Sequence, residues 1–123
     1  MVSHQCEFQL NWDGDILIVS PVGSVESLDS EAVEQASRKI RTPLRDKEVP
    51  LLILDLTGLN YFGSLFLSLL LRCHKQVKMD GGGLAICGAS SAARDLLSLT
   101  ALDTLWALYK TRQEAMDALG GSD

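Results

Sequence analysis

The chain has 123 residues, of which 46% are hydrophobic and 22% are charged, a composition typical of one globular domain that excludes a disordered or fibrous protein. Eleven Lys and Arg residues against sixteen Asp and Glu residues leave a net charge of −5, which argues against nucleic-acid binding because phosphate contacts need a basic surface. The longest apolar run, Leu65 to Leu71, is interrupted by Ser68. It is far shorter than the roughly 18 residues that span a bilayer, so we expect no direct membrane insertion.

The N-terminal residues and the cysteines indicate the cellular compartment. The stretch from Met1 to Glu7 has no basic start and no apolar run, so we expect no secretory signal. Cys6, Cys73 and Cys87 are odd in number and widely spaced, which is typical of reduced core thiols rather than of a disulfide framework. The sequence therefore predicts a cytoplasmic protein in which neither Cys73 nor Cys87 forms a disulfide.

The chain opens with the pattern of a β-hairpin. Every second residue over 6–12 is apolar, which predicts a half-buried strand. Asp13-Gly14 is a favoured hairpin turn, and the β-branched run over 15–20 predicts a more central strand that ends at Pro21 and Gly23.

Helices and short apolar strands alternate after the hairpin. Periodicity predicts helices over 31–40, 64–78, 91–99 and 112–119, and strands over 51–55, 84–87 and 105–109. Asp29 or Ser30 can cap the first helix. The order ββαβαβαβα predicts a single α/β domain over residues 1–123, with its core at about 6–119. Its mixed sheet consists of the N-terminal hairpin followed by parallel strands, joined by about four α-helices in right-handed crossovers.

Motifs for catalysis, metals and phosphates are missing. Neither histidine has a partner at metal-ligand spacing, and we interpret His74 as a residue at the boundary of the second helix. The run Gly81 to Gly83 follows a helix and precedes a strand, so its amides do not lie at a helix N-terminus where they would bind an anion. We expect no catalytic residue, no metal and no cofactor; an enzyme or nucleotide-binding protein using this turn stays a third alternative.

The segment between the third strand and the second helix is the best candidate for a functional site, because ligands of open α/β sheets bind at the carboxyl ends of strands. On a helical wheel, Ser64 begins a polar stripe that faces outward. The stripe continues through Ser68, Arg72, Lys75 and Gln76, whereas Phe66, Leu70, Cys73 and Val77 lie on the opposite side and should face the sheet.

Ser64 has two compatible interpretations. As an N-cap, its hydroxyl would accept a hydrogen bond from an early amide of the helix. As a phosphoserine, it would place about two negative charges next to the positive end of the helix dipole, where they cost the fold little and change the surface that a partner covers.

Several sequence segments, together with the order of elements, resemble the STAS family, the domain shared by sulfate transporters and anti-sigma-factor antagonists. The resemblance covers about 8–119. The segments are Pro21-Val-Gly-Ser-Val-Glu26, Leu51-Leu-Ile-Leu-Asp-Leu-Thr-Gly-Leu-Asn-Tyr-Phe62, Arg72-Cys-His-Lys-Gln-Val77, Gly82-Gly-Leu-Ala-Ile-Cys-Gly88 and Thr100-Ala-Leu-Asp-Thr-Leu105.

Antagonists of this family typically carry Asp-Ser-Ser-Gly or Asp-Ser-Thr-Gly at the start of the second helix, where a partner kinase phosphorylates a hydroxyl. The matching positions here are Gly63-Ser64-Leu65-Phe66, so only the serine is retained. Leu65 enlarges the apolar patch, and Phe66 should face the sheet, either pushing the helix outward or filling space beside small neighbours such as Ala85.

The resemblance implies an anti-sigma-factor antagonist that binds an anti-sigma factor of the serine-kinase type and thereby regulates transcription. Ser64 is the candidate phosphoacceptor. The candidate partner-binding residues are Glu26, Phe62, Gly63, Ser64 and Leu65. The alternative is a non-phosphorylated STAS adaptor, a subunit that binds a transporter ATPase or a large signalling assembly.

Overall fold

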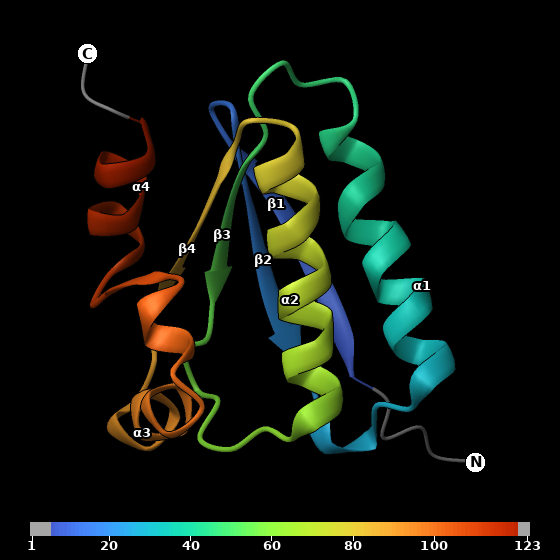
Figure 1. Cartoon of the computed structure of the whole chain (residues 1–123), viewed down its shortest axis with the longest axis vertical. Coiled ribbons are helices and arrows are strands. Elements are labelled where there is room, and N and C mark those ends of the chain that lie inside the picture. Colours follow the sequence, from blue (N-terminus) through green and yellow to red (C-terminus); the bar gives the residue numbers. More distant parts are fainter. Residues whose placement is uncertain (1–5, 121–123) are drawn as a thin grey trace.

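The structure is a computed structural model that describes residues 6–120. Five strands form one sheet in the order in which they occur along the chain (Figure 1). They are β1 (Glu7–Asp13), β2 (Ile16–Val22), β3 (Leu51–Asp55), β4 (Gly83–Cys87) and β5 (Ala107–Tyr109). β1 is antiparallel to β2, and every later pair is parallel. The expected mixed α/β sheet with an N-terminal hairpin is confirmed.

The helices occupy both faces of this sheet. They are α1 (Ser30–Arg41), α2 (Ser64–Met79), α3 (Ser91–Leu99) and α4 (Arg112–Gly120), with short 3₁₀ turns η1 (Val25–Ser27), η2 (Thr42–Leu44) and η3 (Leu102–Thr104). In Figure 1, α1 and α2 lie side by side, and α4 lies on the other side of the sheet. Asp29 is the N-cap of α1, because its Oδ1 accepts a hydrogen bond from the amide of Ala32 over 2.8 Å.

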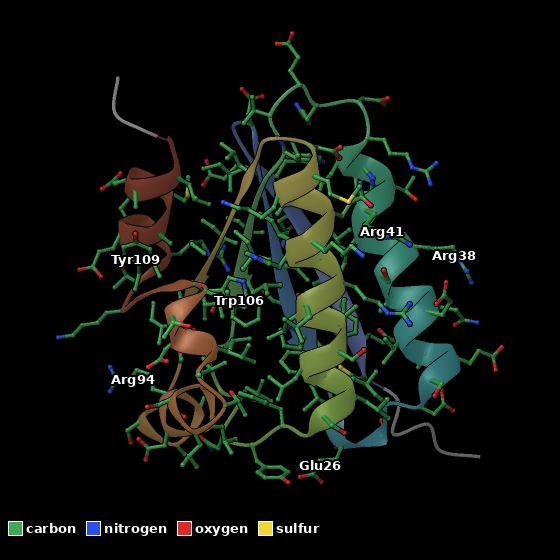
Figure 2. The ribbon with its side chains drawn as sticks, viewed as in Figure 1. Glu26, Arg38, Arg41, Arg94, Trp106 and Tyr109 are labelled. Carbon is green, nitrogen blue, oxygen red and sulfur yellow. The ribbon has the colours of Figure 1, made fainter. Side chains whose placement is uncertain are left out.

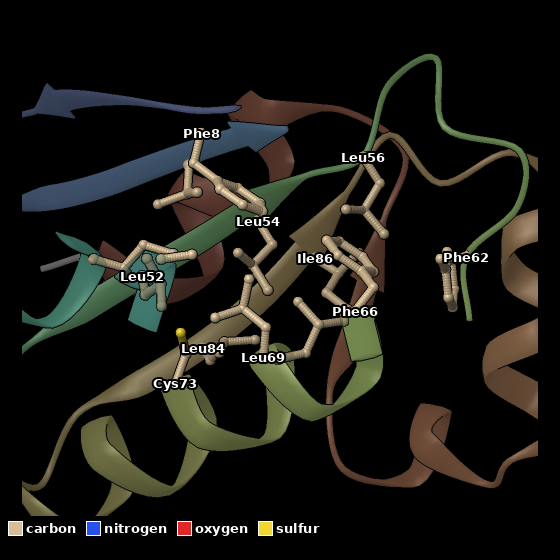
Figure 3. Close-up of a cluster of buried hydrophobic side chains, with 14 of the residues drawn as sticks. Phe8, Leu52, Leu54, Leu56, Phe62, Phe66, Leu69, Cys73, Leu84 and Ile86 are labelled. Atoms are coloured by element: carbon tan, nitrogen blue, oxygen red, sulfur yellow. The ribbon is translucent and has the colours of Figure 1, made fainter. Parts of the chain in front are cut away.

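Alternation along the strands produces two separate cores. Leu52, Leu54 and Ile86 face α1 and α2 and belong to the larger core (Figure 3). Ile53 and Ala85 point the other way and pack beneath α4. A single helix covers this second face because β1 is polar there, with exposed Glu7, Gln9, Asn11 and Asp13.

Phe66 lies in the larger core, where its side chain is 1% exposed. Its ring centroid is 5.4 Å from that of Phe62, with the two rings tilted (Figure 3). The expected accommodation beside Ala85 is wrong, since Ala85 faces the opposite side of the sheet. Phe66 instead fills its space together with Phe62 and the strand residues of the larger core.

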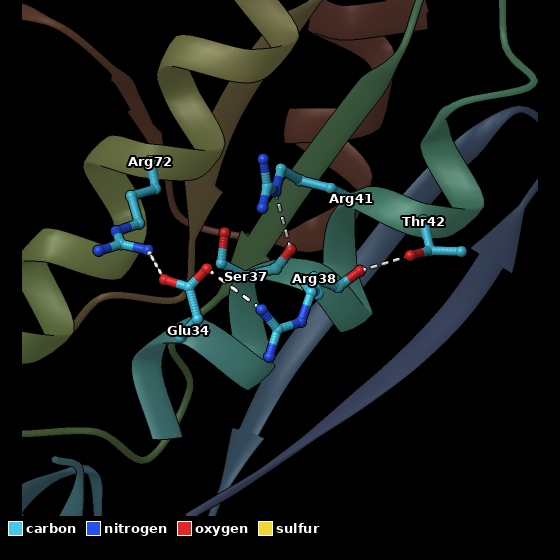
Figure 4. Close-up of polar contacts among 6 residues, drawn as sticks. All are labelled: Glu34, Ser37, Arg38, Arg41, Thr42 and Arg72. Atoms are coloured by element: carbon cyan, nitrogen blue, oxygen red, sulfur yellow. Dashed lines mark hydrogen bonds and ion pairs between the residues drawn. The ribbon is translucent and has the colours of Figure 1, made fainter. Parts of the chain in front are cut away.

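Charged side chains join α1 to α2 on the solvent side. Glu34 of α1 forms an ion pair with Arg72 of α2 and a second one with Arg38, at 3.2 Å (Figure 4). The hydrogen bond from Arg72 lowers the pKa of the Glu34 carboxyl below its usual value, and the charge of Arg72 adds to this effect. This exposed contact connects α1 to α2, the helix that carries the candidate site at its first turn.

Several expected boundaries differ from the structure by one or two residues. Pro21 does not end the second strand: β2 continues to Val22, because β3 pairs with β2 only as far as Val19 and no ladder hydrogen bond needs the N–H that proline lacks. The hairpin loop consists of Gly14 and Asp15, because Asp13 still pairs with Ile16 and Gly14 takes the positive φ of +60°. The last strand begins at Ala107 and not at residue 105, because the amides of Leu105 and Trp106 both donate to the carbonyl of Leu102 and keep the chain turned.

Cys73 and Cys87 are buried free thiols, as expected. Burial raises the pKa of both thiols to about 12. At neutral pH both are therefore protonated and unreactive, and they act as small apolar core residues.

Candidate functional site

Two segments far apart in the sequence meet at the N-terminus of α2 and form a groove of about 240 Å³. One segment follows β2 and includes η1; the other connects β3 to α2. The groove is lined by Val25, Glu26, Leu28, Tyr61, Gly63, Ser64, Leu65 and Phe66. The groove thus contains four of the five residues predicted to bind a partner: Glu26, Gly63, Ser64 and Leu65.

Ser64 is exposed and is the first residue of α2. The expectation that it caps the helix is wrong: Gly63 is the N-cap, and the first backbone hydrogen bond runs from the amide of Leu67 to the carbonyl of Gly63 over 3.2 Å. No side chain of residues 6–120 caps α2, and its first turn carries no acidic residue. The hydroxyl of Ser64 therefore lies beside amides that have no intrahelical partner.

The groove is apolar with one acidic side chain. Tyr61 is 56% exposed and Leu65 is 37% exposed, which is high for large apolar side chains that line the same groove. Glu26 is the one charged residue among the described residues that line the groove, and its side chain projects near the first turn of α2 (Figure 2). The surface can therefore bind a partner that offers apolar atoms and a cation.

Phe62 does not take part in this surface. Its side chain is 2% exposed and packs on Phe66 in the larger core. Phe62 immediately precedes the N-cap of α2, so its burial attaches the chain to the core just before the helix begins. Its effect on a partner would be indirect, through the position of Gly63 and Ser64.

A polar network that the sequence did not predict holds the start of the β3–α2 connection. Oδ1 of Asp55 accepts hydrogen bonds from the hydroxyl of Thr57 at 2.6 Å and from its amide at 3.1 Å, and Oδ2 accepts from Arg112 of α4 at 2.8 Å. Burial alone would raise the pKa of Asp55, but these bonds from Thr57 and Arg112 lower it overall. A carboxylate at a strand end followed two residues later by threonine is a signal of such a turn.

The same connection is attached to α3. The hydroxyl of Ser90 accepts from the amide of Ala93 over 3.1 Å and caps α3, and it donates to the carbonyl of Leu59 over 3.4 Å. The connection that carries Tyr61 is therefore held at its start, by Asp55, and at its middle, by the bond from Ser90 to Leu59. A docking surface on a restrained loop loses less conformational entropy when it binds.

The described part of the chain contains no group of three His, Cys, Asp or Glu side chains that could hold a metal ion. None of its helices is long and apolar enough to cross a membrane.

Comparison with known proteins identifies the family to which this fold belongs. The STAS domain matches residues 7–115. An anti-sigma-factor antagonist (STAS) domain protein from Planctomyces limnophilus is 27% identical, with a TM-score of 0.78, over 93% of this chain and 98% of that one. The Bacillus cell fate determinant SpoIIAA in its phosphorylated form is 24% identical, with a TM-score of 0.67, over 91% and 98% of the two chains.

A murine anion transporter of the solute carrier 26 family matches with a TM-score of 0.68 and 12% identity, over 91% of this chain and 19% of that one. This match reflects a shared fold. The domain match extends from β1 into α4 and so includes every strand and the groove at the N-terminus of α2. The chain is a member of the STAS domain family, and its structure is similar to those of anti-sigma-factor antagonists.

Proposed function

We infer that this STAS domain acts as an anti-sigma-factor antagonist: it binds an anti-sigma factor of the serine-kinase type through the groove at α2, and phosphorylation of Ser64 weakens that binding. Holding the anti-sigma factor would release a sigma factor and so regulate transcription. The observation that carries the proposal is the exposed hydroxyl of Ser64 at the first residue of α2, inside a groove with apolar walls and one carboxylate.

The unmodified groove favours docking. Tyr61 and Leu65 together offer exposed apolar area that a partner would remove from water. Glu26 would meet a cation of the partner, since an unpaired carboxylate at an apolar interface would be costly. Both contributions lie next to the hydroxyl that would be modified.

Phosphorylation would change this surface without unfolding it. The phosphate would lie beside the uncapped amides of α2, where the helix dipole favours negative charge. It would also add about two negative charges next to Glu26 and in front of Leu65, so that the single partner cation that matches Glu26 no longer neutralises the groove and the apolar contact of Leu65 would require desolvation of the phosphate. The switch is electrostatic and steric.

The test uses three forms of the whole chain: wild type, Ser64→Ala and Ser64→Asp. Each is immobilised to capture its partner from a lysate of the source cells, and the kinase-type anti-sigma factor so identified is then purified. Calorimetry should give equal affinities for wild type and Ser64→Ala, and an affinity at least about tenfold weaker for Ser64→Asp, a loss of roughly 1.4 kcal/mol. With ATP, the purified factor should phosphorylate the wild-type chain and not Ser64→Ala.

The adaptor function is the second candidate, and the exposed Leu65 beside a buried Phe66 favours it. These two residues stand where the family's motif has a hydroxyl and a glycine, and they enlarge the apolar contact at the expense of the phosphorylation motif. Capture of a transporter ATPase or of a signalling assembly, with equal affinities for Ser64→Ala and Ser64→Asp, would select the adaptor.

A further inference from the structure

A second and larger groove, of about 610 Å³, lies between β1 and α1. Its floor is apolar and includes Phe8, Leu28 and Ala36, each less than 9% exposed. Leu28 lines this groove and also the groove at α2, so the two grooves lie on either side of η1. Nothing in the proposed function uses the β1 side.

One wall of this groove is the free edge of the sheet. β1 is the outermost strand, on the side of α1 (Figure 1). Asp13 and Ile16 form the hydrogen-bonded pair that closes the hairpin. Along an antiparallel pair of strands, such pairs alternate with pairs whose N–H and C=O groups point away from the partner strand. On β1 these groups therefore point to the free edge at every second residue. Phe8 lies opposite Pro21, which has no N–H, and the carbonyl of Phe8 turns outward and accepts a hydrogen bond from Nζ of Lys39 over 2.8 Å. The backbone groups of Leu10 and Trp12 point to the same edge.

Carboxylates outnumber cations around the groove. Glu7, Asp29 and Glu31 line it, against the single cation of Lys39. Glu7 and Glu31 are exposed, and neither side chain forms a hydrogen bond or ion pair with any residue of the described chain. Asp13 adds a further exposed carboxylate on the same face of β1 as Glu7. The groove therefore combines unpaired backbone groups, an apolar floor and a negative rim.

We propose that this groove binds an extended, lysine- or arginine-rich segment of a partner protein, which pairs with the free edge of β1 as an added strand. Backbone hydrogen bonds to Phe8, Leu10 and Trp12 would supply affinity, as in other strand-addition complexes. Side chains alternating along the segment would place cations on the face of Glu7 and Asp13, and apolar groups on the face of Phe8.

A second copy of the chain fits this edge less well. Antiparallel pairing of two β1 strands centred on Leu10 would place Glu7 of one copy opposite Asp13 of the other, and like charges directly opposite one another destabilise a strand pair. Lys39 also protects this edge, because its hydrogen bond to the carbonyl of Phe8 occupies one backbone acceptor of β1. An incoming strand must displace this ammonium group, so Lys39 limits the affinity.

The experiment measures fluorescence anisotropy of a labelled six-residue peptide of alternating lysine and valine with the full chain. A second peptide has the same side chains but carries N-methyl groups on alternate backbone amides, which removes the donors that a strand needs. We expect saturable binding of the first peptide, weakened by added salt, and binding at least about tenfold weaker for the second. Amide hydrogen exchange at Leu10 and Trp12 should slow when the first peptide binds.

Matched variants locate the site. The double variant Glu7→Lys with Glu31→Lys should bind the lysine–valine peptide at least about tenfold more weakly. The control is Glu48→Lys with Asp95→Lys, which changes the net charge by the same amount away from the groove and should leave the affinity within about threefold of wild type. Lys39→Met keeps an apolar side chain and frees the carbonyl of Phe8, so it should tighten peptide binding at least about threefold. Lys75→Met, at an exposed position of α2, removes the same charge elsewhere and serves as the control. Circular dichroism checks that each variant is folded.

Three outcomes would overturn the proposal: equal binding of the two peptides, equal weakening by the two double variants, or peptide binding only after residues 1–5 are deleted, which would assign the groove to the chain's own N-terminus. Self-association of the chain that slows amide exchange at Leu10 and Trp12 as the protein concentration rises, and that is strengthened in Glu7→Lys, would overturn it as well, in favour of a second copy. Ser64→Asp should not change peptide binding, so failure here is distinct from failure of the kinase interaction.

Discussion

The indole Nε1–H of Trp106 donates a hydrogen bond to Nδ1 of His74 over 2.8 Å, and the two rings meet edge to face with centroids 5.7 Å apart. Trp106 is 2% exposed, so the bond satisfies a donor that would otherwise be buried without a partner. Because Nδ1 accepts, the neutral imidazole carries its proton on Nε2. The bond attaches α2 to the segment that leads into β5, on which Trp106 lies (Figure 2).

The stability of the protein should depend on the protonation of His74. Burial, followed by the charge of Lys78, lowers the pKa of His74 below its ordinary value of 6.5. The unfolded chain therefore binds this proton more tightly, so the contribution of the neutral imidazole is complete above about pH 6.5 and is lost as the pH falls toward and through the folded pKa. Urea unfolding of wild type should show this loss as the pH falls below about 6.5.

His74→Gln is the control for that titration, since an amide oxygen can accept from Trp106 without titrating. The difference in unfolding free energy between wild type and this variant should therefore change over the same pH interval. Parallel pH profiles for the two proteins would contradict the role of His74.

Ser37 carries a buried hydroxyl with no hydrogen-bond partner among the described residues, and its side chain is fully buried on the inner face of α1 (Figure 4). Ser37→Ala removes this unsatisfied group and raises helix propensity, so it should stabilise the protein by up to about 1 kcal/mol. Ser37→Val should instead destabilise by about 1–3 kcal/mol, because added methyl groups overpack a closed site. Urea unfolding measures both; a large loss in Ser37→Ala would mean that the hydroxyl has a partner.

Gly63 leaves the N-terminus of α2 without a side-chain cap. Its φ of −109° and the open space that a Cβ would meet at this position allow other residues without strain. Gly63→Asp should stabilise the protein by about 0.5–1 kcal/mol through capping and the helix dipole, whereas Gly63→Ala, the matched control, should not gain the capping contribution. Thermal unfolding at low salt provides the comparison.

The same variant tests how a phosphate on Ser64 acts. If the phosphate occupies the uncapped amides of α2, phosphorylation should raise the melting temperature of wild type more than that of Gly63→Asp, where a carboxylate already lies beside them. Equal shifts in the two backgrounds would show that the phosphate does not interact with the helix end.

Gly88 permits the network around Asp55. Its φ is +73°, and a Cβ at this position would lie 2.2 Å from Oγ1 of Thr57 and 3.0 Å from Oδ1 of Asp55. Gly88→Ala should therefore cost at least about 2 kcal/mol, from backbone strain and from loss of the hydrogen bonds to Asp55. Gly58→Ala is the matched control: its φ is +87° but the space around it is open. Equal losses of unfolding free energy in the two variants would rule out the packing contribution.

Local sequence patterns were sufficient to predict the order of helices and strands and which side of each is buried. The strand over 51–55 and the helix over 91–99 have the predicted bounds, and the wheel for α2 places Phe66, Cys73 and Val77 on its buried side, as the structure does. Each of these features depends only on the spacing of apolar residues within one helix or strand, which distinguishes the side facing the core from the side facing solvent. Ser64 was likewise expected to be exposed, and it is.

The tertiary structure decided what depends on residues far apart in the chain. Trp106 and His74 are 32 residues apart, and no local pattern pairs a buried indole donor with a boundary imidazole. Glu26 joins Ser64 in one groove only because the parallel crossovers bring η1 next to the start of α2. The N-cap is Gly63 and not Ser64, and the residues on either side of this helix start, Phe62 and Phe66, pack on one another in the core. Sequence periodicity determines which side of an element is buried, whereas packing between elements determines which neighbour it meets.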